Sequence, residues 1–204
     1  MNDLIIQQGV GAYRSLMEFG RPWHISYAAK FGMDYEAVPY ALGRTYTTIE
    51  KFTLPLSYMS RSGRWLMMID ADAIIIGDED WRKALADVDF AAVRNIWGEF
   101  NLGVFFIRDT QASIDFLMKC IDDLPGKIIA CADQTCEQML LNQNLFYSPL
   151  KRQALNRRWN DYYVAAGITE GRRQVKAWHD LQKPPEHKLE EMKRFMEDFK
   201  RGAA

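Results

Sequence analysis

Two aspartates that interrupt an apolar segment constrain the fold of this chain more than any other feature. Residues 65–76 are apolar apart from Asp70 and Asp72. A short apolar run that follows a glycine-containing turn predicts a buried β-strand. Carboxylates at the end of such a strand are costly unless a positive group meets them. Mg²⁺ or Mn²⁺ would meet them and keep sites open for phosphate, which favours a metal site that holds a diphosphate. The alternative is that both aspartates face water or cap the next helix.

The composition is typical of one globular α/β domain. The chain has 204 residues, of which 48% are hydrophobic and 26% are charged. This length can bury a sizeable core, and this hydrophobic content argues against disorder. We therefore expect a single domain over residues 1–204, and one domain of a larger protein would have the same composition.

The net charge and the cysteines bear on partners and location. The formal net charge of −1 gives no overall field that would attract nucleic acid or acidic lipid. No apolar stretch reaches the length of a membrane span, and the first residues do not resemble a signal peptide. Three cysteines, Cys120, Cys131 and Cys136, are too few for a disulfide framework. We expect reduced thiols, a cytoplasmic setting, no transmembrane segment and no nucleic-acid partner.

The hydrophobic pattern predicts strands that alternate with helices. The expected strands are 3–7, 35–38, 65–69, 90–93 and 103–107, and the expected helices are 21–31, 47–60, 80–86, 110–124, 133–142 and 185–201. This alternation predicts an α/β fold with a mostly parallel central sheet flanked by helices and a C-terminal helix. Ligands of such sheets bind at the carboxyl ends of the strands, where Asp70 and Asp72 are expected. The apolar stripe of the last helix indicates core packing, with a partner-binding helix as the alternative.

Seven segments in order resemble motifs of the metal-dependent glycosyltransferases of the GT-A (Rossmann-like) fold. They are 23–35, 49–55, 68–72, 100–104, 133–134 with Asn142, 155–160 and 178–184. The chain is most similar to the retaining glycogenin/lipopolysaccharide-galactosyltransferase type, and also to the galactosyl- and xylosyltransferases of yeast and plants. An Asp-x-Asp motif alone is common, whereas the ordered set is more specific. The chain departs from the pattern at Asn156 (usually Pro), at Pro185 (commonly Trp) and at Lys183, which lies closer to His179 than usual. These departures affect the expected details of the segment that closes over the donor (the donor lid) more than they affect the expected fold.

The resemblance implies a hexosyl- or pentosyltransferase that uses Mn²⁺ or Mg²⁺. Asp72 and His179 would be the principal metal ligands, and Asp70 would bind the metal or the donor. Carboxylates and imidazole suit Mn²⁺, which would stabilise the leaving diphosphate as a Lewis acid. Without the motif, a histidine in this part of the chain would be taken for a surface residue.

Four further residues would bind a nucleotide-sugar donor, which is expected to be UDP-linked. Lys51 and Lys183 would place positive charge against the diphosphate. Tyr13 would stack on the nucleobase, and Asn101 would present its amide to sugar or acceptor. The alternatives are solvated lysines, a half-buried loop aromatic and a turn residue beside Gly103.

The resemblance places Asp133 and Gln134 near the reactive face of the donor sugar. Because Gln is a poor nucleophile, the expected scheme is front-face attack by the acceptor hydroxyl, with retention and with proton transfer to the departing phosphate oxygen. Gln134 would stabilise the cationic sugar and Asp133 would orient its hydroxyls. Alternatively, Asp133 caps the helix that begins there.

Two other functions compete with sugar transfer to a carbohydrate or glycoconjugate acceptor. A phosphohydrolase of the haloacid-dehalogenase type also ends an apolar strand with Asp-x-Asp, but there the motif usually opens the domain. A non-catalytic module that binds a sugar nucleotide would keep the fold without turnover. The basic residues of 151–176 favour a rim near the phosphates or a face for an anionic acceptor over a nucleic-acid patch.

Overall fold

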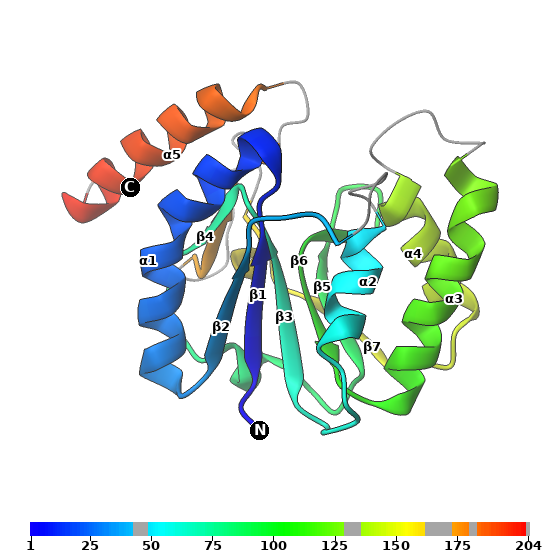
Figure 1. Ribbon diagram of the computed structural model, residues 1–204. Helices are drawn as coiled ribbons and strands as arrows, with labels where there is room; N and C mark the ends of the chain where they lie inside the picture. The colour runs from blue at the N-terminus through cyan, green and yellow to red at the C-terminus, as the bar shows by residue number, and fades with distance from the viewer. Residues whose placement is uncertain (43–48, 129–135, 162–172, 180–182, 203–204) are drawn as a thin grey trace.

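A six-stranded, mostly parallel sheet forms the centre of the molecule (Figure 1). The computed structural model describes residues 1–42, 49–128, 136–161, 173–179 and 183–202. The strands, in sheet order, are β2 (Asp34–Val38), β1 (Leu4–Gln8), β3 (Trp65–Asp70), β6 (Phe100–Arg108), β5 (Phe90–Arg94) and β7 (Arg152–Leu155). Only β6 runs against its neighbours, while the other five strands share one direction. The predicted α/β class is confirmed.

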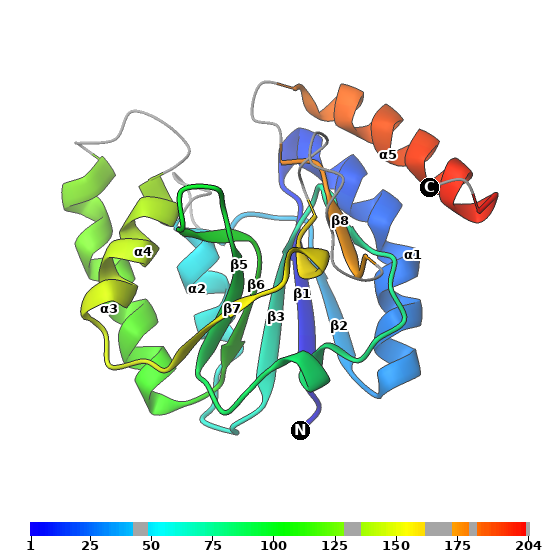
Figure 2. The same ribbon diagram turned by 180° about the vertical axis from the view of Figure 1, so that it is seen from behind.

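Helices cover both faces of this sheet because the strand side chains alternate between them. One face of β1 presents Leu4 and Ile6 to a cluster that includes residues of α2 (Glu50–Ser57), α3 (Gln111–Ile128) and α4 (Cys136–Tyr147). Ile5 points the other way, into a cluster with Tyr27 of α1 (Arg14–Phe31). Figures 1 and 2 show the two layers of helices on either side of the strands.

A small second sheet and the last helix complete the fold on the side of α1. β4 (Ala73–Ile75) pairs antiparallel with β8 (Val175–Ala177). α5 (Pro185–Lys200) packs along α1 through Met192 and Met196, which bury against Leu16 and Met17. The C-terminal helix is therefore part of the core, as its apolar stripe predicts.

Several boundaries differ from the sequence-based expectation. α1 begins at Arg14 rather than at residue 21, with Pro22 inside it. Pro22 and Glu18 are on the exposed face, where water can satisfy the carbonyl that loses its helical partner. The predicted helix 80–86 is wrong: the segment forms only the 3-10 turn Trp81–Ala84, with Leu85 extended. β7 and β8 were not predicted, and the start of the expected helix 133–142 lies outside the described residues.

The described part of the chain bears on two other expectations. None of its helices has the length and apolar character needed to cross a membrane. The Cys120 thiol is free and buried, as predicted. The side chains of Cys131 and Cys136 lie outside the described residues.

A buried histidine ties α1 to the turn that carries the two aspartates. His24 is fully buried, and its Nε2 accepts a hydrogen bond from the backbone N–H of Ile75 at 3.2 Å. Its Nδ1 therefore carries the proton and donates to Gln7 Oε1 at 3.0 Å. The amide of Gln7 in turn donates to the carbonyl of Asp70 at 3.1 Å. Because burial disfavours the imidazolium, the pKa of His24 falls to about 3.

The low pKa of His24 predicts that this protein loses stability in mild acid. Below pH 6.5 the unfolded state binds a proton that the folded state excludes, so stability falls as the pH falls from about 6.5 to about 3. From this group alone we expect a loss of about 2 kcal/mol in the free energy of unfolding between pH 7 and pH 5. Urea unfolding of wild type and His24→Gln at both pH values measures it. His187→Gln on the surface is the control, and equal pH dependence in wild type and His24→Gln would contradict the assignment.

Candidate metal and donor site

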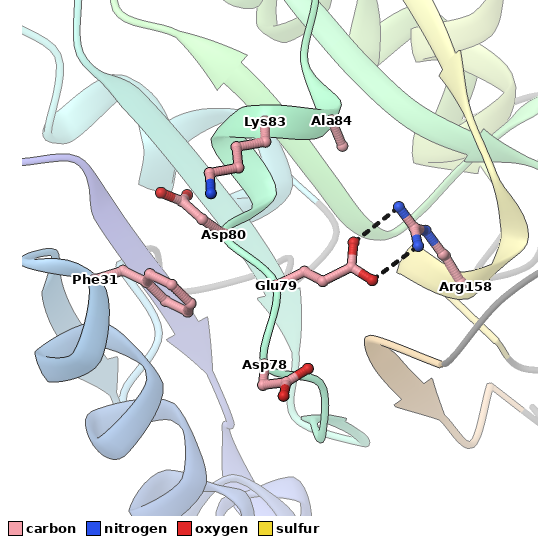
Figure 3. Close-up of a pocket in the computed structure, with 7 residues that line it drawn as sticks. All are labelled: Phe31, Asp78, Glu79, Asp80, Lys83, Ala84 and Arg158. Carbon is pink, nitrogen blue, oxygen red and sulfur yellow. Dashed lines mark hydrogen bonds and ion pairs between the residues drawn. The ribbon is translucent and has the colours of Figure 1, made fainter.

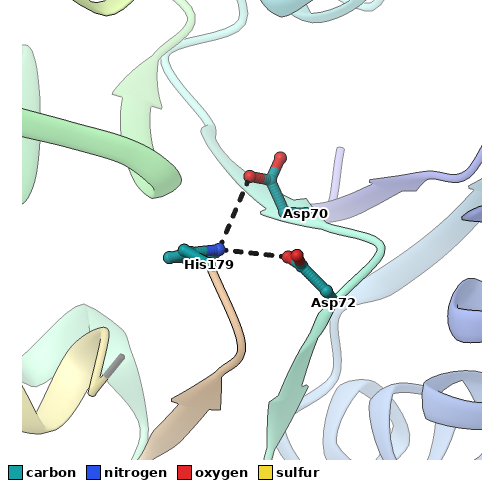
Figure 4. A group of neighbouring side chains, drawn as sticks. All are labelled: Asp70, Asp72 and His179. Atoms are coloured by element: carbon teal, nitrogen blue, oxygen red, sulfur yellow. Dashed lines mark hydrogen bonds and ion pairs between the residues drawn. The ribbon is translucent and has the colours of Figure 1, made fainter. Parts of the chain in front are cut away.

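The candidate site lies at the carboxyl end of β3, where Asp70 and Asp72 meet His179 (Figure 4). β3 ends with Asp70 and β4 begins at Ala73, so Asp70 is the last residue of β3 and Asp72 lies in the turn between the two strands. His179 comes from the far end of the sequence. Antiparallel pairing of β4 with β8 and a 2.8 Å hydrogen bond from the Trp178 N–H to the Asp72 carbonyl bring it to the turn.

The three side chains form a donor set that fits a divalent metal. His179 Nδ1 lies 3.0 Å from Asp72 Oδ1 and 3.9 Å from Asp70 Oδ2, and one ligand atom from each residue lies within 4.8 Å of the others. Ligand atoms about 2.1 Å from one ion lie roughly 3–4 Å apart, so small adjustments would allow all three to bind it. Two carboxylate oxygens and an imidazole nitrogen suit Mn²⁺. The residues expected as metal ligands are thus brought together.

Gly103 is required because the His179 ring lies directly against its backbone. A Cβ placed on Gly103, in β6, would lie 2.0 Å from His179 Nε2, which is far inside contact distance. Glycine, whose side chain is a single hydrogen atom, is therefore the only residue that fits at position 103 without displacing His179.

Two asparagines orient the His179 ring. Asn160 donates from Nδ2 to Asn101 Oδ1 at 2.8 Å, so its own Oδ1 faces His179 Nε2, 3.1 Å away. This acceptor would keep the proton on Nε2 when a metal takes Nδ1, as in metal-binding histidines that hydrogen-bond to a second layer of residues. Asn101, which was expected to contact sugar or acceptor, therefore supports His179 in this structure.

A buried lysine that was not predicted as a site residue completes the surroundings of Asp72. Lys188 of α5 is 1% exposed and donates from Nζ to Asp72 Oδ2 at 2.7 Å. Its Nζ also lies 5.5 Å from the centre of the Tyr13 ring. Burial raises the pKa of Asp72, but His179 and Lys188 outweigh this and lower it to about 2. Asp72 is therefore ionised over the whole physiological range.

The remaining residues that were expected to bind the donor or act in catalysis differ in their positions relative to the site. Lys51 of α2 donates to Asp70 Oδ1 and, at 3.0 Å, to the Leu102 carbonyl, so it belongs to the site. Lys183, just before α5, forms a 2.6 Å ion pair with Glu191. Asp133 and Gln134 lie outside the described residues.

A separate cavity of about 380 Å³ lies beside the end of α1 that is remote from Tyr13 (Figure 3). Its polar lining includes Glu79 and Arg158, which face each other in an ion pair with a 2.9 Å contact. None of the residues expected to bind donor or metal lines this cavity.

Solved structures of glycosyltransferases share this architecture. No protein-family model matches the chain, and no curated protein sequence matches it. A glycosyltransferase involved in glycosylation of the major capsid of PBCV-1 superposes with a TM-score of 0.73 at 10% identity, over 95% of this chain and 100% of that one. The Streptococcus pneumoniae TIGR4 glycosyltransferase GlyE gives 0.60 at 15% identity, over 96% of this chain and 64% of that one.

The galactosyltransferase LgtC, solved in complex with donor and acceptor sugar analogs, gives a TM-score of 0.52 at 14% identity, over 92% of this chain and 94% of that one. The chain has the GT-A fold. This finding confirms the fold that the ordered motifs suggest. At these low sequence identities the similarity shows the fold and does not show which reaction the chain catalyses.

The contact between Gly103 and His179 can be tested by a double-mutant cycle. We expect Gly103→Ala to lower the free energy of unfolding by about 1–3 kcal/mol because the added methyl displaces the imidazole. In the background of His179→Ala the same change should be nearly neutral, since the clashing ring is gone. Chemical unfolding of the four proteins measures both values. An equal cost in both backgrounds would show that the strain arises elsewhere in β6.

Proposed function

We propose that this protein is a metal-dependent glycosyltransferase of hexosyl or pentosyl groups. It would transfer a sugar from a UDP-linked donor to a hydroxyl of a carbohydrate or glycoconjugate acceptor, as one domain over residues 1–204. The observation that carries the proposal is the convergence of Asp70, Asp72 and His179 at the carboxyl end of β3 in a GT-A fold. The glycosyltransferases with similar structures support the same reaction class.

The chain's own residues divide the work of donor binding. Asp70, Asp72 and His179 would hold Mn²⁺ or Mg²⁺, which when bound supplies a Lewis acid to the leaving diphosphate. Lys51 already lies beside Asp70 and would add positive charge next to the phosphates. Lys183, just before α5, would do the same once its ammonium leaves Glu191 for a phosphate.

The chemical step is proposed to proceed with retention. The acceptor hydroxyl would attack the face that the diphosphate leaves, and its proton would pass to the departing phosphate oxygen. Gln134 would stabilise the positive charge on the sugar ring, and Asp133 would orient the ring hydroxyls. Tyr13, which lies just before α1 with its ring centre 5.5 Å from the Lys188 Nζ, would stack on the nucleobase of the donor.

The two competing functions receive less support. A haloacid-dehalogenase phosphohydrolase would use Asp70 as a nucleophile, whereas here Asp70 bonds to Lys51 and shares a donor set with His179. The glycosyltransferase structures cited above also do not favour it. A non-catalytic module is distinguished by turnover, since only an enzyme hydrolyses or transfers a nucleotide sugar.

Calorimetric titration with UDP tests the donor site. We expect UDP to bind wild type with Mn²⁺ and to lose affinity about hundredfold or more in Asp72→Asn, because a metal ligand is lost. Asp87→Asn, at an exposed carboxylate, is the control. If GDP binds in place of UDP, the donor would be assigned as a GDP-linked sugar instead of a UDP-linked one. Binding of neither nucleotide, or wild-type affinity in Asp72→Asn, would overturn the metal-dependent donor site.

A further inference from the structure

Each carboxylate of the Asp-x-Asp pair has a lysine of its own. Lys51 donates to Asp70 Oδ1, and Lys188 donates to Asp72 Oδ2 at 2.7 Å. The two lysines come from different layers, because α2 covers one face of the sheet and α5 packs on the helix that covers the other (Figure 1). The pairing therefore does not follow from one local motif.

The two ion pairs are shielded from solvent to different degrees. The side chain of Lys188 is 2% exposed and that of Asp72 is 8% exposed, whereas those of Lys51 and Asp70 are 22% and 32% exposed. A buried lysine is costly unless it is paired, so the burial of Lys188 depends on the Asp72 carboxylate. Salt in the solvent screens such a pair weakly.

The two lysines offset the negative charge that would otherwise attract a divalent cation to this site. The two positive charges balance the two carboxylates, so these four side chains carry no net charge before a ligand binds. Lys188 also holds Oδ2 of Asp72, which leaves Oδ1 as the oxygen that faces His179. A metal would therefore gain one oxygen from Asp72 and would be repelled by two nearby ammonium groups.

A nucleoside diphosphate would add the negative charge that the neutral set of two lysines and two aspartates does not provide for a metal. Its phosphates would neutralise the metal and also face Lys51. We propose that Lys51 and Lys188 act as built-in counter-ions that keep the nucleotide-free site from binding a divalent metal, so that the metal binds tightly only together with the donor diphosphate. This inference rests on the proposed function, because it assumes that a nucleoside diphosphate is the second ligand.

Mn²⁺ titrations of Lys51→Met and Lys188→Met test the counter-ion role. Without nucleotide, we expect each substitution to raise the Mn²⁺ affinity by at least about tenfold, because one unit charge about 5 Å from a divalent ion has this effect even in a water-like medium. UDP should strengthen Mn²⁺ binding to wild type more than it strengthens binding to either variant. Lys193→Met is the matched control, because Lys193 lies on α5 but pairs with Glu190 at the surface. Calorimetry or Mn²⁺ electron paramagnetic resonance gives the affinities without any measurement of activity.

Thermal unfolding supplies a second readout for the buried pair. Lys188→Met leaves Asp72 buried without its lysine, so we expect a lower melting temperature in EDTA and a larger rise on addition of Mn²⁺ than wild type shows. Lys188→Gln keeps a hydrogen-bond donor and removes only the charge, and it should show the same Mn²⁺ response. If neither Lys188 variant folds, Lys51→Met, at the more exposed of the two pairs, decides whether the lysines act as counter-ions.

The outcomes separate this inference from the proposed function. Unchanged Mn²⁺ affinity in the variants, or equally tight Mn²⁺ binding to wild type with and without UDP, would overturn the counter-ion role even if UDP binds. Failure of wild type to bind UDP in the presence of Mn²⁺ would overturn the proposed function. In that case a rise in Mn²⁺ affinity on removal of either lysine would still support its action as a counter-ion to the metal.

Discussion

The burial of the Asp72 carboxylate is the constraint on which the rest of the site depends. A charge that is removed from water needs partners, and Asp72 finds them in His179 and Lys188. Those partners come from the segment after β8 and from α5, so the last part of the chain has to return to the turn after β3. The two-stranded β4–β8 sheet and the packing of α5 on α1 are the structural means of that return.

The position of the His179 side chain depends on residues from several elements of the fold. Its ring is held by Asn160, which is itself held by Asn101, and it occupies space that only a glycine at position 103 leaves open. The turn that carries Asp70 is steadied from the other side by Gln7 and His24. The proposed metal ligands thus rest on a second layer of hydrogen bonds drawn from α1, β1, β6 and Asn160, and such a layer fixes ligand geometry in metal sites.

Local sequence patterns predicted most of the fold, and their failures have clear physical causes. Strands β1, β3, β5 and most of β6 follow short apolar runs, and the stripe on α5 follows a helical period. The expected helix at 80–86 fails because Asp80 caps a single 3-10 turn and Leu85 is extended. β8 is three residues long and depends on pairing with β4, so no local pattern marks it.

The sequence by itself determined the class of fold, the position of the acidic pair at a strand end and, through ordered motifs, the distant His179. It could also have marked Lys188, which shares a helical face with Met192 and Met196 at intervals of four residues. Only the tertiary structure decided that Lys188 bonds to Asp72 and Lys51 to Asp70, and that Asn101 supports His179. These contacts join residues from about 20 to more than 100 positions apart. Such pairings arise from the packing of whole elements, and periodicity within one element carries no information about them.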